Sequence, residues 1–440
     1  MIKKSILWSV CMFVIVGLQA QQNKISFTEF DLENGLHVIL HQDNSTPIVA
    51  VSVLYHVGSK NEDPERTGFA HFFEHLMFEG SKHIDRGEFD TYVSNAGGVN
   101  NANTSMDRTF YYEIFPSNQL ELGLWLESER MLHAKIDSKG IETQREVVKE
   151  EKRQRVDNQP YGTWLSNSFA KAFHTHPYKW PVIGSMDHLN AASDEDFQNF
   201  YKKYYLPNNA TLSIAGDIDI DETRKLVEKY FSEIPSGPEV THPDVVEPPL
   251  EGPIVDTVYD NISLPAMFFT YRIPAQTHPD IYAIKMLATL LSGGESSRMV
   301  KRLQNEEKLA IQISNFPMNL EHPGVSFIIA LPNVGVELET LREGIDEEIM
   351  KVQQELISDR EYQKLQNQFE SQFIQSNTSM VSIAESLANY YTYYGNTNLI
   401  NTEIENIRKV TREDIRRVAR EYFTPENRVL LYYLPQPQNQ

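Results

Sequence analysis

The stretch GFAHFFEHLMFEG, residues 68–80, carries two histidines, His71 and His75, and a glutamate, Glu74, directly before the second. In an α-helix the positions i and i+4 lie on one face, about 40° apart, so the two imidazoles can hold one metal ion. Glu74 is too close in sequence to join them as a ligand, but it is placed to activate a water. This H-x-x-E-H order reverses the commoner H-E-x-x-H motif of zinc peptidases. The pattern predicts a zinc site with its own general base.

A third ligand is needed, because a chain with 13 histidines contains such a string by chance in roughly three of a hundred cases. In the charged segment 141–156, Val147 and Val148 mark the expected inward face of a helix. Glu151 projects within ~10° of the midpoint between them, whereas Glu150 points about 110° away. A buried carboxylate requires a cation or hydrogen-bond donors. We therefore expect Glu151 to be the third ligand and Glu150 to be solvated; a salt bridge from Glu151 to a core arginine is the alternative.

The elements that must position these side chains form an α+β pattern. Strand-like runs such as Val49–His56 and Thr109–Phe115 alternate with helical patterns such as Leu120–His133 and Asp280–Leu291. Residues 235–253 hold six of the 22 prolines, which predicts an extended connector between two parts of ordinary domain size.

The two parts look like copies of one another. Residues 193–216 align with residues 411–434 at a constant offset of 218, so that Tyr204 falls on Tyr422 and Pro207 on Pro425. Both copies predict a capped amphipathic helix, a turn and a strand. We therefore expect an internal duplication that makes two similar domains, each a β-sheet packed with helices. The expected boundaries are a signal peptide at 1–20, a zinc-bearing domain at 21–235, a linker at 236–253 and a related domain without a metal site at 254–440.

The first twenty residues have the pattern of a secretory signal peptide. Two lysines precede a largely apolar stretch, residues 6–18, and the run ends at the small residue Ala20. The only cysteine, Cys11, lies in this run, so the mature chain would hold a metal by histidine and carboxylate alone. We expect an exported protein, periplasmic or extracellular, with no membrane span in the mature chain. A retained N-terminal anchor that tethers it to the membrane is the alternative.

The charge balance is acidic, with 40 Lys+Arg against 61 Asp+Glu and a formal net charge of −21. Such a field repels nucleic acid and mildly favours cationic peptides. We therefore expect no nucleic-acid partner.

His71, Glu74, His75 and a glutamate 76 residues after the second histidine resemble the zinc site of the pitrilysin family of metallopeptidases, the inverzincins. The length resembles that of the short, processing-peptidase-like branch. Further segments that match the family are residues 34–59, 97–115, 145–151, 176–184 and 290–310.

The resemblance implies two α+β domains that close like a clam around a central substrate cavity, with one Zn²⁺ per chain on the N-terminal domain. It also implies that Asn101, Ala102 and Thr104 lie on a substrate-side strand, to which an extended peptide adds by main-chain hydrogen bonds. A plain edge strand is the alternative.

The sequence departs from the family at two places. The family usually has a second glutamate two turns before the zinc-ligating one, and here that position is Gln144, which we expect to orient a ligand by hydrogen bonding. Many active members carry an Arg and a Tyr seven residues apart that grip substrate, and the matching positions are Gln304 and Ile311. The resemblance then implies a related partner subunit that supplies this pair, in a heterodimer; a homodimer stays open.

The predicted function is a zinc-dependent endopeptidase that hydrolyses peptides or unfolded polypeptide segments with a metal-activated water. The alternative within the same family is a non-catalytic binding or assembly subunit. An exported zinc-binding protein without turnover is a third possibility.

Overall fold

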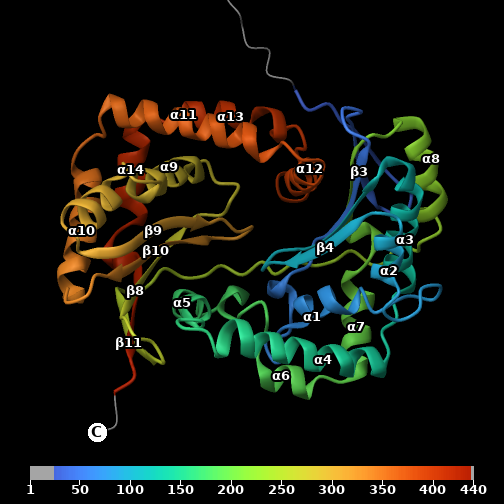
Figure 1. Ribbon diagram of the computed structural model, residues 1–440, viewed down its shortest axis with the longest axis horizontal. Helices are drawn as coiled ribbons and strands as arrows, with labels where there is room; N and C mark the ends of the chain where they lie inside the picture. Colours follow the sequence, from blue (N-terminus) through green and yellow to red (C-terminus); the bar gives the residue numbers. More distant parts are fainter. Residues whose placement is uncertain (1–23, 438–440) are drawn as a thin grey trace, which may run out of the picture.

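The computed structural model describes residues 24–437 and contains two β-sheets, each packed with helices (Figure 1). The predicted signal peptide and Cys11 lie outside these residues. Among the helices of the described residues, none is both long and apolar enough to span a bilayer.

The first half of the chain builds a six-stranded sheet in the order β1-β2-β6-β3-β5-β4. The pair β2/β6 is parallel and the remaining neighbours are antiparallel. The strands are β1 (Thr28–Asp31), β2 (His37–Gln42), β3 (Ile48–Tyr55), β4 (Val99–Thr104), β5 (Thr109–Pro116) and β6 (Ala210–Gly216). The helices are α1 (Phe69–Leu76), α2 (Phe89–Asn95), α3 (Leu120–His133), α4 (Ser138–Lys152), α5 (Trp164–Ala172), α6 (Met186–Ala191), α7 (Asp194–Tyr204) and α8 (Ile220–Phe231).

The second half builds a five-stranded sheet in the order β7-β11-β8-β10-β9, again with one parallel pair, β11/β7. The strands are β7 (Ile254–Asp260), β8 (Ala266–Ile273), β9 (Ala310–Met318), β10 (Gly324–Pro332) and β11 (Arg428–Pro435). The helices are α9 (Asp280–Ser292), α10 (Leu338–Gln354), α11 (Asp359–Ser376), α12 (Met380–Tyr394), α13 (Leu399–Lys409) and α14 (Arg412–Tyr422).

The two sheets share one topology. If β1 is left aside, the order β2-β6-β3-β5-β4 repeats as β7-β11-β8-β10-β9. The offset of 218 residues carries β3 onto β8 and β6 onto β11, and it carries α7 onto α14 with the same Ser/Thr–Asp capping box. The predicted α+β class, with two similar sheet-and-helix units, is confirmed.

One helix of each half packs on the sheet of the other half. Phe169 and Ala172 of α5 belong to a core cluster with Phe268, Phe327 and Val429 of the second sheet. The offset of 218 places α5 within α12, and α12 does the reciprocal: Ile383, Ala384 and Leu387 pack on Ile39, Ala50 and Ala215 of the first sheet. Figure 1 shows α12 beside β3 and α5 beside the strands of the second sheet. Each half of the chain therefore contributes one helix to the packing of the other half.

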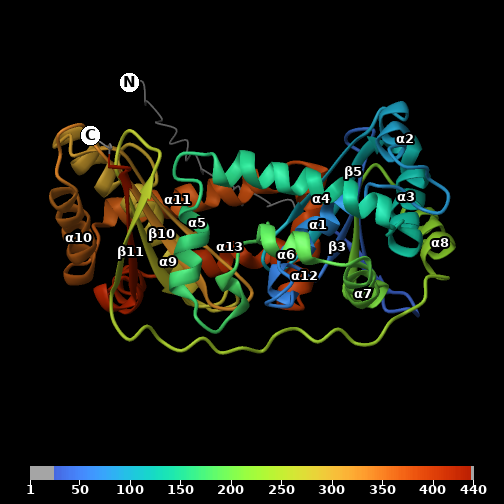
Figure 2. The same cartoon turned by 90° about the horizontal axis from the view of Figure 1, so that it is seen from below.

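The proline-rich segment between α8 and β7 contains no helix or strand, and it runs along one side of the molecule from the first half to the second (Figure 2). The expected domain boundaries around it remain a prediction, because each packed unit also contains one helix from the opposite half.

Candidate metal centre

The helix that carries the histidines begins at a close contact between two backbones. Gly68, the N-cap of α1, has φ of 95°, and a Cβ there would lie 2.8 Å from the carbonyl oxygen of Ile183. Gly184 on the facing segment has φ of 74°, and a Cβ there would lie 2.4 Å from the oxygen of Thr67. Both positions require glycine, because other residues are strained at positive φ and have a Cβ that would clash.

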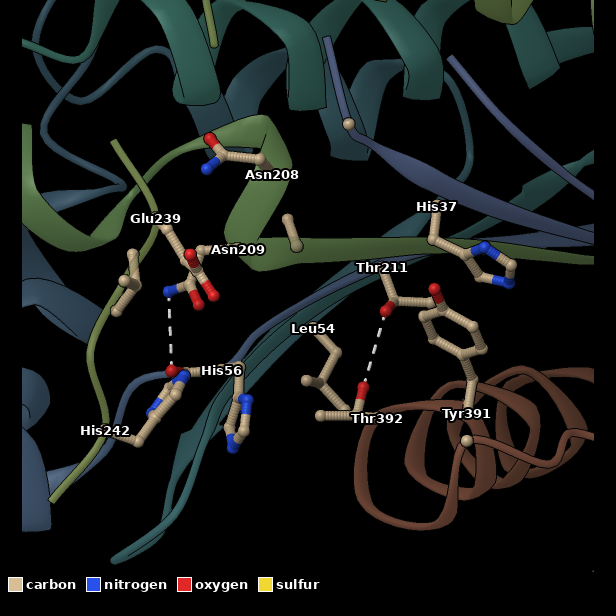
Figure 3. A pocket seen from close by; sticks show the side chains of 14 residues that line it. His37, Leu54, His56, Asn208, Asn209, Thr211, Glu239, His242, Tyr391 and Thr392 are labelled. Atoms are coloured by element: carbon tan, nitrogen blue, oxygen red, sulfur yellow. Dashed lines mark hydrogen bonds between the residues drawn. The ribbon is translucent and has the colours of Figure 1, made fainter. Parts of the chain in front are cut away.

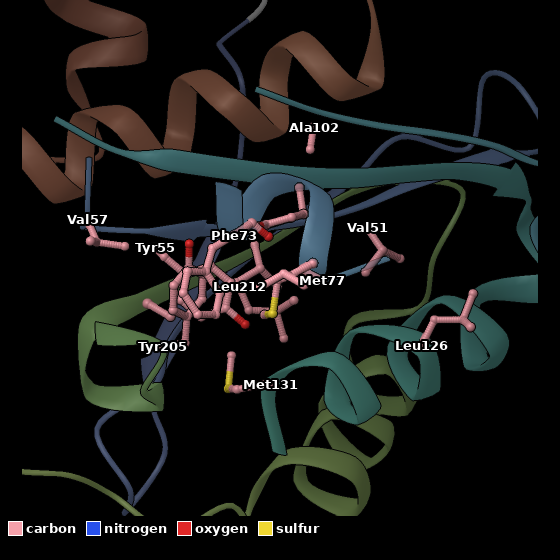
Figure 4. Packing of buried hydrophobic residues seen from close by; sticks show 14 of the residues in the cluster. Val51, Tyr55, Val57, Phe73, Met77, Ala102, Leu126, Met131, Tyr205 and Leu212 are labelled. Atoms are coloured by element: carbon pink, nitrogen blue, oxygen red, sulfur yellow. The ribbon is translucent and has the colours of Figure 1, made fainter. Parts of the chain in front are cut away.

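The aromatic residues of α1 fix its orientation against the first sheet. Phe69, Phe72 and Phe73 are buried, and Phe69 stacks on Phe197 of α7 at 4.5 Å between ring centroids. Figure 4 shows Phe73 and Met77 among the buried side chains of the sheet. Because this face is buried, His71, Glu74 and His75 are on the opposite, partly accessible face.

The glutamate comes from α4, which lies against α1. The buried residues of α4 are Gly140, Ile141, Arg145 and Val148, which follow helical spacing. Val147, expected to face inward, is instead 43% exposed, because the buried stripe is centred on Ile141, Arg145 and Val148 rather than between the two valines. The side chain of Glu151 is 15% exposed, since it lies one turn beyond Val148, whereas that of Glu150 is 53% exposed.

Two helices thus bring three potential ligands together. The Nε2 atoms of His71 and His75 lie 3.6 Å and 3.2 Å from the same oxygen of Glu151, Oε2. The three potential ligand atoms all lie within 4.8 Å of one another. Zinc with tetrahedral ligands at ~2.0–2.2 Å separates them by roughly 3.3 Å, so the arrangement fits this ion with small movements.

Glu74 lies beside this cluster on α1 and is held by the edge strand β4. Thr104 Oγ1 donates a hydrogen bond to Glu74 Oε2 over 2.6 Å. Burial raises the pKa of Glu74, although the hydrogen bond from Thr104 and the nearby His75 partly offset that rise. A carboxylate with a raised pKa beside a metal site is suited to proton transfer near neutral pH.

The ionisation states of His71 and Glu151 suit metal binding. Burial, and secondarily the charge of His75, lower the pKa of His71 to about 4, so its imidazole is neutral at neutral pH. The hydrogen bond with His75 lowers the pKa of Glu151, which keeps it ionised. Neutral imidazole and carboxylate are the forms that bind zinc.

Glu151 also has an arginine partner. Its second oxygen, Oε1, lies 2.6 Å from Arg155 Nη1, one helical turn further on. The expected alternative was a core arginine, but Arg155 is 77% exposed. Because the guanidinium of Arg155 is largely in solvent, this pair contributes little free energy, and it leaves Oε2 directed at the histidines.

The hydrogen bond that Gln144 makes among the described residues goes to Glu79 and not to a candidate ligand. Gln144 Nε2 donates to Glu79 Oε1 over 2.6 Å, and Glu79 in turn pairs with Arg86. Glu79 lies three residues after the end of α1, and its carboxylate accepts a hydrogen bond from the amide that we expected to orient a ligand.

The three expected substrate-strand residues lie on β4, which is one of the two edge strands of the first sheet within residues 24–437. Asn101 is exposed, Ala102 is buried and Thr104 is half-buried. In Figure 1, β4 runs towards the middle of the molecule, close to α1.

Gln304 and Ile311 belong to the second half of the chain, whereas the metal cluster is built by α1 and α4 of the first half. Gln304 is in a π-helical turn, Val300–Glu306, and Ile311 is on β9 with 44% exposure. The nearby Arg302 is paired with Glu307, Glu347 and Glu348, so its guanidinium is engaged within its own half.

A hollow of about 440 Å³ lies where the end of the first sheet, the proline-rich segment and α12 meet (Figure 3). The rings of His56 and His242 stack there at 3.8 Å, and Thr211 is 3.4 Å from Thr392 of α12. None of its lining residues is a candidate ligand or base, so it is separate from the metal cluster.

Two residues near the cluster were missed by sequence reasoning. Arg155 had a local signal, since it is four positions after Glu151 in a helical pattern. Glu62 had none: its carboxylate accepts hydrogen bonds from the backbone N–H groups of Gly68 and Ala70, at the start of α1, and that contact depends on a loop conformation.

The fold defines the class of this protein: two sheet-and-helix units with the pitrilysin-like two-domain arrangement. A crystal structure of a protease from Helicobacter pylori has a TM-score of 0.88 at 30% identity and covers 93% of this chain and 100% of the other. Pitrilysin has a TM-score of 0.78 at 19% identity, with 95% of this chain but only 47% of pitrilysin covered.

Sequence comparison gives the family. Residues 37–185 match the insulinase family (peptidase family M16), and residues 191–369 match the peptidase M16 inactive domain. The zinc protease PqqE of Helicobacter pylori is 31% identical over 99% of each chain. The chain belongs to the peptidase family M16, which confirms the predicted pitrilysin-type relationship.

Proposed function

We propose that this chain is a zinc-dependent endopeptidase that hydrolyses peptides or unfolded polypeptide segments. The observation that carries the proposal is the convergence of His71 and His75 on one oxygen of Glu151, with Glu74 beside them. Three protein ligands leave a fourth position for water or substrate, which distinguishes catalytic from structural zinc sites.

We assign one Zn²⁺ to His71, His75 and Glu151. The zinc, when bound, supplies a Lewis acid that polarises the scissile carbonyl and acidifies the attacking water. Within the described residues His71 Nδ1 is buried without a hydrogen-bond partner, which leaves Nε2 as the atom directed at Glu151.

Glu74 is the proposed general base. Its carboxylate takes a proton from the attacking water and passes it to the leaving amine. Because water attacks the carbonyl directly, no covalent intermediate forms. Thr104 is the proposed positioning residue, because its hydroxyl holds one oxygen of Glu74 and leaves the other for proton transfer.

The proposed substrate site is the free edge of β4, with Asn101, Ala102 and Thr104 as the contacting positions. A peptide that adds to an edge strand is held by main-chain hydrogen bonds, which tolerates many side chains. Thr104 joins this edge to Glu74, so a scissile bond beside Thr104 would lie close to the base.

The decisive experiment is cleavage of a quenched peptide by the purified protein, with and without a chelator, alongside Glu74→Gln. This variant should keep its zinc and lose about 100-fold or more in kcat, because proton transfer is lost while the ligands remain. Glu150→Gln, on the exposed side of the same helix as Glu151, is the matched control and should keep full activity.

His75→Ala should lose both zinc and cleavage. An active, zinc-loaded His75→Ala protein would remove His75 from the ligand set. Near-normal turnover by Glu74→Gln would refute the role of Glu74 and favour the alternative, a non-catalytic binding or assembly subunit of the family.

We further propose that the active form contains a second, related subunit. Gln304 and Ile311 stand where a substrate-gripping Arg and Tyr are expected, and Arg302 is tied to three carboxylates. The chain also spans only 47% of pitrilysin, so the longer protein has room for a second such unit in one chain. Co-purification from the native host should yield a heterodimer whose cleavage rate exceeds that of the isolated chain; full speed in isolation would contradict this.

The N-terminal pattern supports export, with cleavage after Ala20 and a periplasmic or extracellular location. N-terminal sequencing of the protein from its native host tests this. A sequence that begins at Met1 would favour the retained anchor.

A further inference from the structure

We propose that His83, Glu129 and His133 form a second metal-binding site, selective for a divalent transition-metal ion such as Zn²⁺. Within residues 24–437, two groups of three potential ligands lie close enough to hold one ion. One is the cluster of His71, His75 and Glu151, and the other is this one, whose ligand atoms also lie within 4.8 Å of one another.

Two of the ligands come from one face of α3. Glu129 and His133 are four residues apart, the spacing at which two side chains of a helix can bind one ion. The third comes from the segment after α1, where His83 Nδ1 lies 2.7 Å from Glu129 Oε1. The rings of His83 and His133 are 5.6 Å apart at 86° to each other.

The carboxylate at the centre is held in place before any ion binds. Glu129 is buried, with 7% of its side chain exposed, and its Oε2 accepts hydrogen bonds from Ser81 Oγ over 2.5 Å and from the His83 backbone over 3.3 Å. Oε1 is left for His83 and for an ion. An ion would replace the proton between Nδ1 and Oε1, and the distance between these two atoms would increase by roughly 0.6 Å, from 2.7 Å to the separation of two zinc ligands.

The helix end adds to the attraction for a cation. His133 is the last residue of α3, at the negative end of the helix dipole. The positive side chains nearby are mostly engaged: Arg86 pairs with Glu79 and Asp137, and Lys135 lies 3.8 Å from Asp85. Lys82 is exposed to solvent.

The donor set selects the class of ion. Two imidazole nitrogens and one carboxylate oxygen suit Zn²⁺, Ni²⁺ or Cu²⁺, whereas Mg²⁺ and Ca²⁺ prefer oxygen ligands throughout. The half-exposed His83 gives an ion access from solvent, with 52% of its side chain accessible.

An ion at this place would link α3 to the segment that follows α1. The backbone already makes contacts there, since Lys82 N donates to His133 O over 3.1 Å and Ser81 forms an isolated bridge with Ala134. The same segment continues to Arg86, which pairs with Glu79, the partner of Gln144 on α4. The site would therefore stabilise the surroundings of α1 and α4 without contacting the first cluster.

Zinc titration of chelator-treated full-length protein tests the proposal without any activity measurement. In the His71→Ala/His75→Ala background, which lacks the first cluster, isothermal titration with ZnCl₂ should show one zinc bound per chain. Adding His133→Ala should weaken that binding at least about tenfold. The matched control is His174→Ala, an exposed histidine elsewhere in the same half, which should leave it unchanged.

No zinc binding by the folded background variant, or binding that survives His133→Ala unchanged, would overturn the proposal. If circular dichroism shows that the background variant is unfolded, bound zinc is counted in the parent protein instead. Two zinc ions in the parent and one in His133→Ala support the second site, and a single ion in the parent refutes it.

Discussion

At the scale of single residues, the position of the histidines depends on a carboxylate outside the H-x-x-E-H motif. The N-cap of α1 is Gly68, which has no side chain to accept hydrogen bonds from the first turn. The buried Glu62 does so instead, with 2.8 Å contacts to the N–H groups of both Gly68 and Ala70. The carboxyl oxygens satisfy two otherwise unpaired donors at the start of the helix, although burial raises the pKa of Glu62 to about 8.

Glu62→Ala should therefore lower the free energy of unfolding by about 2 kcal/mol, because two buried N–H groups lose their acceptor. It should also weaken zinc binding by roughly tenfold, since the first turn of α1 carries His71. Urea unfolding and a chelator competition assay measure the two effects. Glu65→Ala removes an exposed carboxylate of the same loop and should change neither; equal losses in both variants would contradict the capping role.

At the scale of elements, the exchange of α5 and α12 makes each sheet depend on the other half of the chain. Ile383, Ala384 and Leu387 of α12 are buried on the first sheet, although they lie far along the chain from its strands. Burial of such side chains removes apolar area from water and supplies much of the stability of the packed unit. A substitution that weakens the packing of α12 is therefore expected to destabilise the first sheet.

Ile383→Ala should lower stability by about 2–4 kcal/mol, since it leaves a cavity between α12 and the first sheet. Hydrogen exchange should become faster in β3 and β6, the two strands that α12 contacts most. The matched control is Ile374→Ala on α11, where the side chain is 62% exposed and the loss should stay below about 0.5 kcal/mol. Faster exchange confined to the second half would contradict the exchanged packing.

At the scale of the whole molecule, a buried polar cluster joins the two halves. Lys60, fully buried in the first half, lies 3.1 Å from Asp107 and pairs with Glu321 from the second half. Glu321 also lies 2.7 Å from His56 Nε2, and its backbone N–H donates to Asp107 over 3.0 Å. The contact between the halves is thus partly ionic.

This cluster predicts a loss of stability in acid. Burial alone would raise the pKa of Glu321, but His56 and Lys60 lower it to about 2, below the ~4.3 of an unfolded chain. Its contribution is therefore complete above about pH 4.3 and is lost as the pH falls towards 2. Burial also lowers the pKa of His176 and of His242 to about 4. Because an unfolded histidine takes up its proton near pH 6.5, stability should already decline between about pH 6.5 and 4.

Glu321→Gln should cost about 2 kcal/mol at pH 7, because Lys60 keeps a buried charge with one partner fewer. The difference from the parent should shrink as the pH falls from about 4 to 2, where the parent's Glu321 is itself protonated. Thermal unfolding across this pH range measures both effects. Glu251→Gln, at an exposed position of the connecting segment, should follow the parent at every pH; a difference from the parent that does not depend on pH would exclude an electrostatic origin.

The periodicity of apolar and polar residues in the sequence by itself determined several secondary-structure elements and the residues of the candidate metal cluster. The strands β3 and β5, the helices α3 and α9, and the repeat of α7 and β6 as α14 and β11 follow from spacing along the chain, because each element shows its own period of apolar residues in the sequence. The pairing of His71 with His75, and the choice of Glu151 over Glu150, follow from helical geometry in the same way, even though Val147 was assigned to the wrong face.

Tertiary packing determined the contacts between side chains of different elements, which spacing along the chain does not predict. The hydrogen bond from Thr104 to Glu74, the turn of Gln144 towards Glu79, the exchange of α5 with α12 and the meeting of His83 with His133 all join segments from different elements. Such contacts depend on how whole helices and strands pack against one another. If a helix were shifted by one turn, each of its side chains would meet a different partner. The sequence therefore identifies which side chains can bind a metal, whereas the residues that surround each of them are determined only by the folded structure.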